Sequence, residues 1–274
     1  MSFDKFASSS IGRKQLMALT GFLLVGFLLV HLAGNFLVFA GYGKHYNHQQ
    51  ASLVSSFDAN QQADLKDPKK NKLLNSAPEI AKAQDDIDEI PLNQYALKLK
   101  SLGPILWIMR LVLLIIFVAH MFLFYQVVTS NKMARPTPYH IKASKGNTSH
   151  LSSTMHVTGV VIFAYLIFHL CDFTLHILPN TSKINGVDEG LYGLVINGFL
   201  NPIRSGLYIV AMGAIGMHLT HAIQSACQTF GINHPRYTPL IKKASVGLGL
   251  VIALGYISIP IFVYIKHGLL GAAQ

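Results

Sequence analysis

Long apolar stretches separated by polar connections run through most of this chain. Five of them are long enough to cross a bilayer, at about residues 15–39, 104–130, 153–178, 206–230 and 246–265. A tilted helix needs about 20 mostly apolar residues to cross roughly 30 Å of hydrocarbon. The pattern therefore predicts an all-α membrane protein with five transmembrane helices in a single membrane domain, residues 1–274. The first stretch is too long to be a cleavable signal peptide.

The connection between the first two stretches, residues 41–101, is the longest. Its middle, residues 64–90, mixes lysines with acids and has few aromatic residues, which is typical of a solvated segment. Residues 93–102 have an amphipathic pattern, which favours a helix at the membrane interface. We therefore expect a long outward-facing loop that contains an insertion.

Charge indicates how the helices are oriented. The chain is 51% hydrophobic and only 12% charged, yet its net charge is +10. The N-terminus and the second and fourth connections hold one acid, Asp4, and these basic residues: Lys5, Arg13, Lys14, Lys132, Arg135, Lys142, Lys145, Arg236, Lys242 and Lys243. By the positive-inside rule these segments face the cytoplasm, and five spans put the C-terminus outside. The surplus charge then reflects topology, so we predict no nucleic-acid binding.

Each of the first four apolar stretches carries one histidine deep within it: His31, His120, His169 and His218. An ionisable ring is costly in hydrocarbon, so such residues usually face a bundle interior and mark a site. Four imidazoles supply two axial ligands to each of two haems. The alternative is that the histidines only hydrogen-bond between helices. Because they occur on four consecutive helices, we predict that these helices form a haem-binding bundle.

Helix geometry favours one pairing of the histidines. With a rise of 1.5 Å per residue, His120 and His218 each lie about 18 Å from the cytoplasmic ends of their helices. His31 and His169 lie about 25 and 21 Å from theirs. This favours an inner pair, His120 with His218, and an outer pair, His31 with His169. An error of a few residues in the helix ends would remove so small a difference, and the nearby His221 is an alternative ligand.

Other polar residues are candidates for roles around the haems. Asp172 is the only acid within the five stretches and follows His169 by three residues. With His176, it is a candidate for proton exchange with a bound quinone, and the alternative for Asp172 is pairing with a cation. Arg110 and Arg204 are candidate partners of haem propionates. An anchoring role at the membrane interface is an equal alternative for Arg204.

Small residues in the same stretches allow two interpretations. Four glycines lie near His31 or His218: Gly26, Gly34, Gly213 and Gly216. Glycine lets a flat macrocycle approach the backbone, and it also allows close helix packing. The two cysteines, Cys171 and Cys227, are too few for an iron–sulfur cluster, which takes four ligands.

Short motifs around the histidines give the chain a family resemblance. They are SSIGRK at 9–14, MALTG at 17–21, VHLAGN at 30–35, WIMRL at 107–111, SSTM at 152–155 with TG at 158–159, HLTH at 218–221 and QTFG at 228–231. In this order and spacing they resemble the di-haem cytochrome b subunit of succinate:quinone oxidoreductases, most closely the bacterial b558-type. This subunit is the membrane anchor of succinate dehydrogenase or fumarate reductase. The resemblance covers all five apolar stretches and fails mainly over residues 49–91, which look like an insertion.

The resemblance implies two haem b groups, with His31 and His169 on the outer iron and His120 and His218 on the inner iron. It implies a non-flavin subunit of respiratory complex II, linked to the tricarboxylic acid cycle, in the bacterial cytoplasmic membrane. A flavoprotein would carry out the succinate chemistry, and an iron–sulfur subunit would dock on the cytoplasmic face. Electrons would pass between that subunit and a membrane quinone, commonly menaquinone in this branch.

One position departs from part of the family. Some di-haem fumarate reductases have a glutamate two residues before the fourth-helix ligand, where it serves a transmembrane proton path. Here that position is Gly216. The resemblance therefore does not extend to that path.

Three other functions compete with this interpretation. The same four histidines would suit a di-haem cytochrome b anchor of another dehydrogenase, such as a hydrogenase or formate dehydrogenase. They would also suit a histidine-dependent ion transporter, although the chain has no paired helix breaks of the kind such proteins use. A purely structural anchor would carry no haem.

Overall fold

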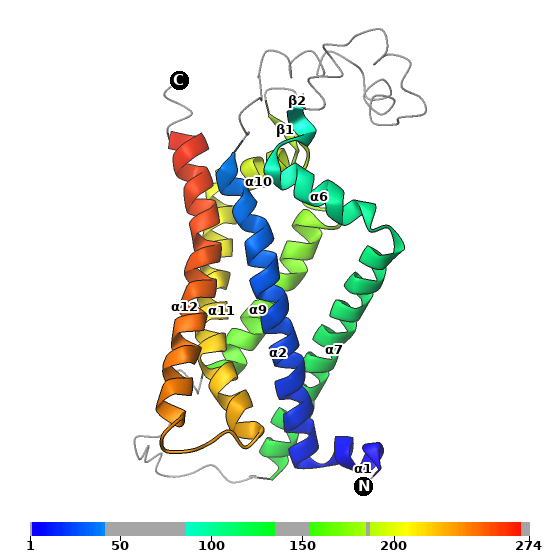
Figure 1. The fold of residues 1–274 in the computed structure, drawn as a ribbon, viewed down its shortest axis with the longest axis vertical. Coiled ribbons are helices and arrows are strands. Elements are labelled where there is room, and N and C mark those ends of the chain that lie inside the picture. The colour runs from blue at the N-terminus through cyan, green and yellow to red at the C-terminus, as the bar shows by residue number, and fades with distance from the viewer. Residues whose placement is uncertain (1, 42–85, 135–153, 185–186, 270–274) are drawn as a thin grey trace. The chain divides into compact units, whose positions relative to one another are not determined.

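The computed structural model describes residues 2–41, 86–134, 154–184 and 187–269 (Figure 1). Most of the predicted loop insertion, residues 42–85, lies outside the described residues. So do three of the basic residues used to predict orientation, Arg135, Lys142 and Lys145.

Within the described residues, five helices are long and apolar enough to cross a membrane. They are α2 (Ser10–Asn35) with its 3₁₀ extension η1 (Phe36–Ala40), α7 (Pro104–Met133), α9 (Met155–Phe173), α11 (Pro202–Thr229), and α12 (Thr238–Val263) with its π-helical extension η2 (Tyr264–Leu269). Large apolar side chains on α7, such as Trp107, Leu111 and Val118, are exposed, as side chains in contact with lipid would be. The prediction of a mainly helical chain with five helices able to span a membrane is confirmed by the length and composition of these helices.

The helix ends differ from those predicted from the apolar pattern. α2 begins at Ser10 and α12 at Thr238, because the helices continue through polar residues that flank the apolar stretches. α9 ends early, at Phe173. Beyond it, the N–H of Leu175 bonds back to the carbonyl of Leu170, and His176 takes a left-handed conformation with φ of 51°. The helical register that would place His176 on the same face as His169 therefore does not extend to it.

Short elements follow or precede the long helices. The helix α1 (Phe3–Ser8) lies at the N-terminus, and α6 (Pro91–Ser101) covers most of the segment predicted to be amphipathic. The strands β1 (Lys183–Ile184) and β2 (Val187–Asp188) pair antiparallel, and α10 (Gly190–Leu200) follows them. The side chain of Asn93 joins α6 to α10, because it donates to the carbonyls of Ile87 and Glu189 and accepts from the N–H of Tyr192. Burial, together with the charge of Glu189, raises the pKa of Tyr192.

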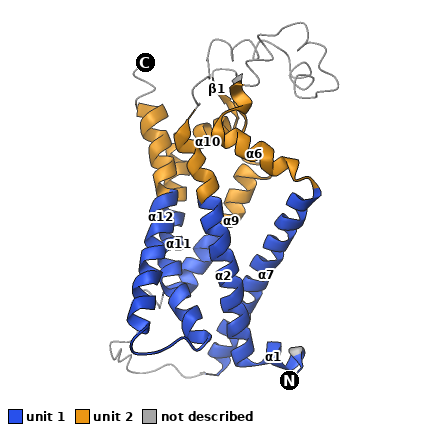
Figure 2. Ribbon diagram, in the orientation of Figure 1, with its two compact units in different colours: residues 1–32, 104–165, 210–256 blue, residues 33–103, 166–209, 257–274 orange. Residues whose placement is uncertain are grey.

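The chain divides into two compact units (Figure 2). Unit 1 comprises residues 1–32, 104–165 and 210–256, and unit 2 comprises residues 33–103, 166–209 and 257–274. The division falls inside α2, α9, α11 and α12. His31, His120 and His218 belong to unit 1, whereas His169 belongs to unit 2.

In unit 1, α11 and α12 pack closely through small residues. A Cβ added to Gly216 would lie 2.7 Å from the Cβ of Ala253, and one added to Gly249 would lie 2.8 Å from the carbonyl oxygen of Gly216. Such contacts let helix backbones approach within a membrane. Gly216 therefore serves helix packing, and a glutamate would not fit in its place. A Cβ at Gly213, on the same helix, would meet nothing within 4 Å.

Candidate functional site

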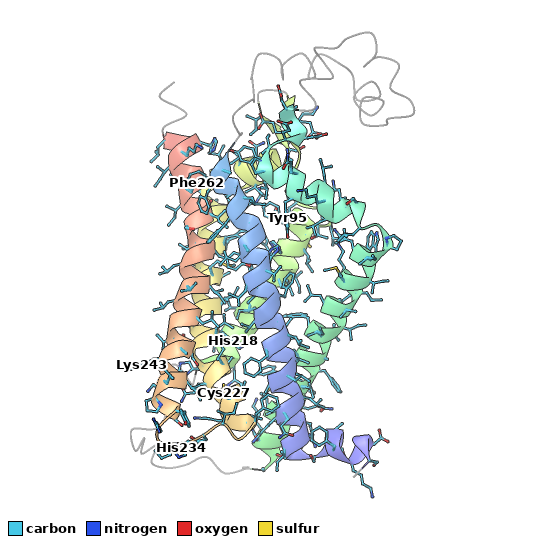
Figure 3. The ribbon with its side chains drawn as sticks, in the orientation of Figure 1. Tyr95, His218, Cys227, His234, Lys243 and Phe262 are labelled. Atoms are coloured by element: carbon cyan, nitrogen blue, oxygen red, sulfur yellow. The ribbon has the colours of Figure 1, made fainter. Side chains whose placement is uncertain are left out.

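The four predicted haem ligands lie on four different helices. His31 is on α2, His120 on α7, His169 on α9 and His218, labelled in Figure 3, on α11. All four side chains are partly buried. The residues around the four rings are not all of the same kind.

His120 faces a threonine of α2. Its Nδ1 lies 2.9 Å from the hydroxyl oxygen of Thr20. That hydroxyl donates its own hydrogen to the carbonyls of Leu16 and Met17 on the preceding turn, both at 3.0 Å. The carbonyl of Met17 is also in hydrogen-bonding reach of the His120 ring. Because the hydroxyl hydrogen is already used and a carbonyl only accepts, Nδ1 of His120 must be the donor.

His218 has the same surroundings on another pair of helices. Its Nδ1 lies 3.1 Å from the hydroxyl oxygen of Thr158 on α9. Thr158 donates to the carbonyls of Thr154 and Met155, both at 3.1 Å, and Met155 is in hydrogen-bonding reach of the ring. Nδ1 of His218 is therefore also protonated.

This protonation leaves Nε2 of both rings with a free electron pair. A neutral imidazole protonated at Nδ1 binds metal through Nε2, and a fixed hydrogen bond at the other nitrogen sets the ring's orientation. His120 and His218 both belong to unit 1, and both rings have the same kind of threonine contact.

The glycines beside these rings are not the ones considered from the sequence. A Cβ added to Gly21 would lie 3.4 Å from Cε1 of His120, and one added to Gly159 would lie 3.6 Å from Cε1 of His218. Gly34 instead makes room for the Tyr95 ring, which would lie 2.7 Å from its added Cβ, and Gly26 has open space. The glycines that border imidazoles are those that directly follow Thr20 and Thr158.

His31 is bordered by aromatic rings. It stacks on Phe27, with ring centroids 5.2 Å apart, and its centroid lies 6.2 Å from that of Tyr256 on α12. The hydroxyl of Tyr256 donates to the carbonyl of Leu28 at 2.8 Å, which fixes that ring against α2. Because His31 and His169 belong to different units, their pairing stays a prediction from the sequence.

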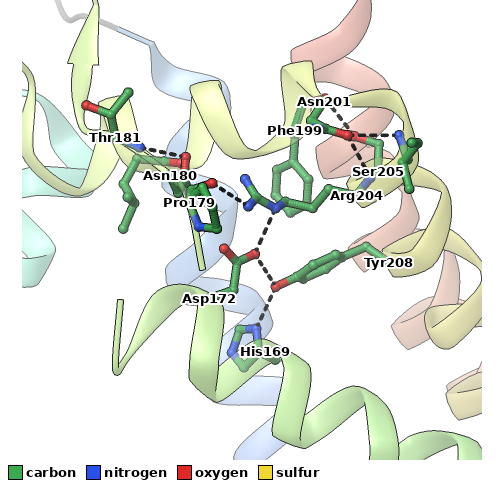
Figure 4. A network of polar contacts seen from close by, with 12 residues as sticks. His169, Asp172, Pro179, Asn180, Thr181, Phe199, Asn201, Arg204, Ser205 and Tyr208 are labelled. Carbon is green, nitrogen blue, oxygen red and sulfur yellow. Dashed lines mark hydrogen bonds and ion pairs between the residues drawn. The ribbon is translucent and has the colours of Figure 1, made fainter. Parts of the chain in front are cut away.

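In unit 2, His169 begins a chain of polar contacts that Figure 4 shows from close by. Its Nδ1 lies 3.3 Å from the hydroxyl oxygen of Tyr208 on α11. Tyr208 donates to Oδ2 of Asp172 at 3.1 Å, so the phenol oxygen is left to accept from Nδ1 of His169. The Nε of Arg204 lies 3.2 Å from the same carboxylate oxygen. The order of contacts is therefore His169, Tyr208, Asp172 and Arg204.

Asp172 is fully buried, and Arg204 has a side-chain exposure of only 11%. Arg204 also donates to the carbonyl of Pro179 at 2.9 Å. Asp172 thus pairs with a cation, Arg204, and its role in proton exchange stays a prediction. Among the described residues, the second carboxylate oxygen, Oδ1, is buried with no hydrogen-bond partner. Sequence reasoning missed Tyr208, since tyrosines are common in membrane helices.

The remaining candidates, Arg110, His176 and His221, have fewer polar contacts in the described residues. Arg110 is exposed, and its guanidinium lies over the ring of Trp107, 5.0 Å from the centroid. His176 is exposed on the turn after α9. His221 has a buried Nε2 with no hydrogen-bond partner among the described residues. No threonine contact like that of His218 is found for His221 in the part of the chain described, so His218 is the better-prepared ligand.

Comparison of the chain with protein-family models, with curated proteins and with solved structures gives no match.

Proposed function

We propose that this chain is the di-haem cytochrome b membrane anchor of a bacterial succinate:quinone oxidoreductase, in which it passes electrons between an iron–sulfur subunit and membrane quinone. The observation that carries the proposal is that the rings of His120 and His218 have the same kind of hydrogen-bond partner. Nδ1 of each ring lies within hydrogen-bonding distance of a threonine hydroxyl that is bonded to its own helix, which leaves Nε2 of each ring available. Two helix-borne imidazoles prepared in this way are what an axial ligand pair requires.

The donor set fits a haem better than a bare metal ion. Among residues 2–41, 86–134, 154–184 and 187–269, no group of three or more His, Cys, Asp or Glu side chains could hold a metal ion. Zinc sites in proteins use three or four side-chain ligands. A pair of imidazoles supplies two, which is the number that a haem iron takes besides its macrocycle. Within the described residues, the imidazoles of His120 and His218 thus match the ligand number of a haem iron.

In the proposed function, residues of this chain would bind the two haem groups and orient the imidazole rings that bind them. A haem between two imidazoles supplies one-electron redox chemistry when bound. His120 and His218 would hold the inner group, and Thr20 and Thr158 keep their Nε2 atoms available. His31 and His169 would hold the outer group. The apolar helices exclude water, which lowers the local dielectric around both sites.

The outer quinone is proposed to react near Asp172. A buried carboxylate oxygen without a partner is rare in proteins and marks a place where a donor is missing. A hydroquinone hydroxyl is such a donor, and Oδ1 of Asp172 would accept its hydrogen bond. Arg204 lies on the other side of the carboxylate, with its Nε 3.2 Å from Oδ2, and leaves Oδ1 available. His176, on the exposed turn after α9, is the second candidate for proton exchange there.

Orientation and partners follow from the charge pattern. The described basic residues of the N-terminus and the fourth connection, such as Arg13, Lys14 and Arg236, would face the cytoplasm, where the iron–sulfur subunit docks. The test is to purify the complex through a tag on this chain. We expect a flavoprotein and an iron–sulfur subunit to co-purify, and succinate to reduce the haem of this chain. Co-purification of a hydrogenase or formate dehydrogenase instead would contradict the proposed partner.

A further inference from the structure

The same five-residue pattern occurs on two helices. Residues 17–21 of α2 and residues 155–159 of α9 both read Met-x-x-Thr-Gly. In each, the methionine carbonyl and the threonine hydroxyl face a histidine ring, and the glycine borders it. The two histidines, His120 and His218, are the proposed ligands of one haem. The pattern therefore occurs once for each ligand of the inner site.

We propose that Thr20 and Thr158 are positioning residues that fix the tautomer and direction of the two inner imidazoles and thereby set the redox potential of the inner haem. The inference rests on the proposed function. It goes further by assigning a role to two residues that do not touch the haem themselves.

The contacts explain how a threonine can do this. A hydroxyl is free to rotate and can either donate or accept. Here it is held, because the hydrogen of each threonine points at carbonyls of the preceding turn at 3.0 to 3.1 Å. The oxygen then presents only electron pairs to Nδ1. Replacing the hydroxyl by a methyl group would leave a partly buried N–H with a weaker partner and would release the ring orientation.

The expected electronic effect has a definite sign. An acceptor at Nδ1–H makes the imidazole more electron-rich and raises its basicity as a ligand. An electron-rich ligand favours the ferric over the ferrous state, which lowers the midpoint potential. Loss of the threonine hydroxyl should therefore move the inner potential in the positive direction. The outer ligand His169 contacts Tyr208 instead, so its haem should not respond.

The glycines complete the arrangement. A Cβ added to Gly21 would be in van der Waals contact with Cε1 of His120, at 3.4 Å. The contact at Gly159 is similar, at 3.6 Å from Cε1 of His218. Each ring thus has the hydroxyl at Nδ1 and a glycine of the same helix near Cε1.

Other threonines provide a matched control. Thr129 on α7 makes the same two contacts to its own helix, donating to the carbonyls of Tyr125 at 2.9 Å and Gln126 at 3.1 Å. It has no histidine contact among those found in the described residues. Thr129→Val therefore removes a hydroxyl of the same kind from a place where the inference assigns it no role.

The experiment is a redox titration of the purified full-length protein, followed by haem absorbance and by electron paramagnetic resonance of the ferric form. The variants are Thr20→Val, Thr158→Val, Thr20→Ser and Thr129→Val. We expect each single valine variant at positions 20 and 158 to shift one of two midpoint potentials positively, or to lose that one haem, with the other unchanged. Thr20→Ser and Thr129→Val should match the wild type, and the double valine variant should shift further than either single one.

Unchanged potentials and spectra in both valine variants would overturn the inference, and so would a Thr20→Ser variant that behaves like Thr20→Val. If the valine variants do not accumulate, Thr20→Ala and Thr158→Ala are titrated instead, since alanine adds no bulk. Failure of these as well, with Thr129→Val accumulating normally, would overturn the inference by making the hydroxyl's role structural. A wild-type protein without haem would instead defeat the proposed function.

Discussion

The Nε atom of Arg204 lies 3.2 Å from Oδ2 of Asp172, and this ion pair is what allows an acid to be fully buried in an apolar helix. An isolated carboxylate would be costly there, because the surroundings cannot replace its hydration. Arg204 compensates the charge, and Tyr208 adds a hydrogen bond to the same oxygen. The pair lies between α9 and α11 within unit 2, so it joins these helices as well.

Removing one partner of this pair should destabilise the protein strongly. Asp172→Asn leaves the guanidinium of Arg204 buried without its counter-charge, and Arg204→Gln leaves the carboxylate in the same state. Breaking a buried pair in this way costs about 3–5 kcal/mol. The free energy of unfolding in detergent, measured against denaturant, tests this. Arg110→Gln is the control, because Arg110 is exposed and only lies over Trp107. If all three variants lose similar amounts, the pair contributes no more than a surface charge.

Tyr208→Phe should act on the outer haem alone. It removes the hydroxyl that accepts from Nδ1 of His169, so the ring becomes a weaker electron donor and the outer midpoint potential rises. The inner potential should stay in place. A redox titration resolves the two, with Tyr125→Phe on the exposed face of α7 as control. Equal shifts of both potentials, or of neither, would contradict this assignment of Tyr208.

Replacement by alanine should affect the stability of the protein differently at two glycines of α11. Gly216→Ala places a Cβ 2.7 Å from the Cβ of Ala253, so α11 and α12 must separate, and overpacking of this kind costs about 1–3 kcal/mol. Gly213→Ala meets nothing within 4 Å, and alanine is the better helix former. Thermal unfolding of the two variants should therefore give a lower midpoint for Gly216→Ala and an unchanged or higher one for Gly213→Ala. Similar midpoints would show that the close contact at Gly216 does not matter.

Replacing either of the two histidines that bind one haem should remove that haem and leave the other in place. His120→Ala and His218→Ala should each lose the same one of two haems, and the double variant should lose no more than either single one. His31→Ala and His169→Ala should lose the other haem. His221→Ala is the control and should keep both. Potentiometric titration identifies which haem remains; a variant of His120 and one of His218 that lose different haems would rule out the pairing.

The membrane spans and the buried histidines could be predicted from the sequence, because their signals lie within short stretches of the chain. Spans follow from runs of apolar residues, and a histidine such as His120 stands out in such a run because it is costly there. The motif at residues 17–21 contains Thr20 but did not predict its contact with His120, since Thr129 is bonded to its own helix in the same way. Only the neighbouring helix distinguishes them. The repeated Met-x-x-Thr-Gly pattern is the one sequence signal that could have found Thr20 and Thr158.

The contacts of Asp172 were harder to predict for the same reason. Its partner Arg204 is on another helix, and sequence position cannot tell a pair with Asp172 from an anchor at the interface. Tyr208 carries no sign of its role unless its hydroxyl is seen between His169 and Asp172. The early end of α9 depends on the backbone conformation of His176, which the apolar pattern does not report.

The central claim is that imidazoles on different helices hold two haems in this chain. Its most direct test is the reduced-minus-oxidised visible spectrum of the purified wild-type protein, with haem quantified per chain. We predict the spectrum of b-type haem at two per chain. A colourless protein, without Soret absorbance after expression in haem-sufficient cells, would contradict the account.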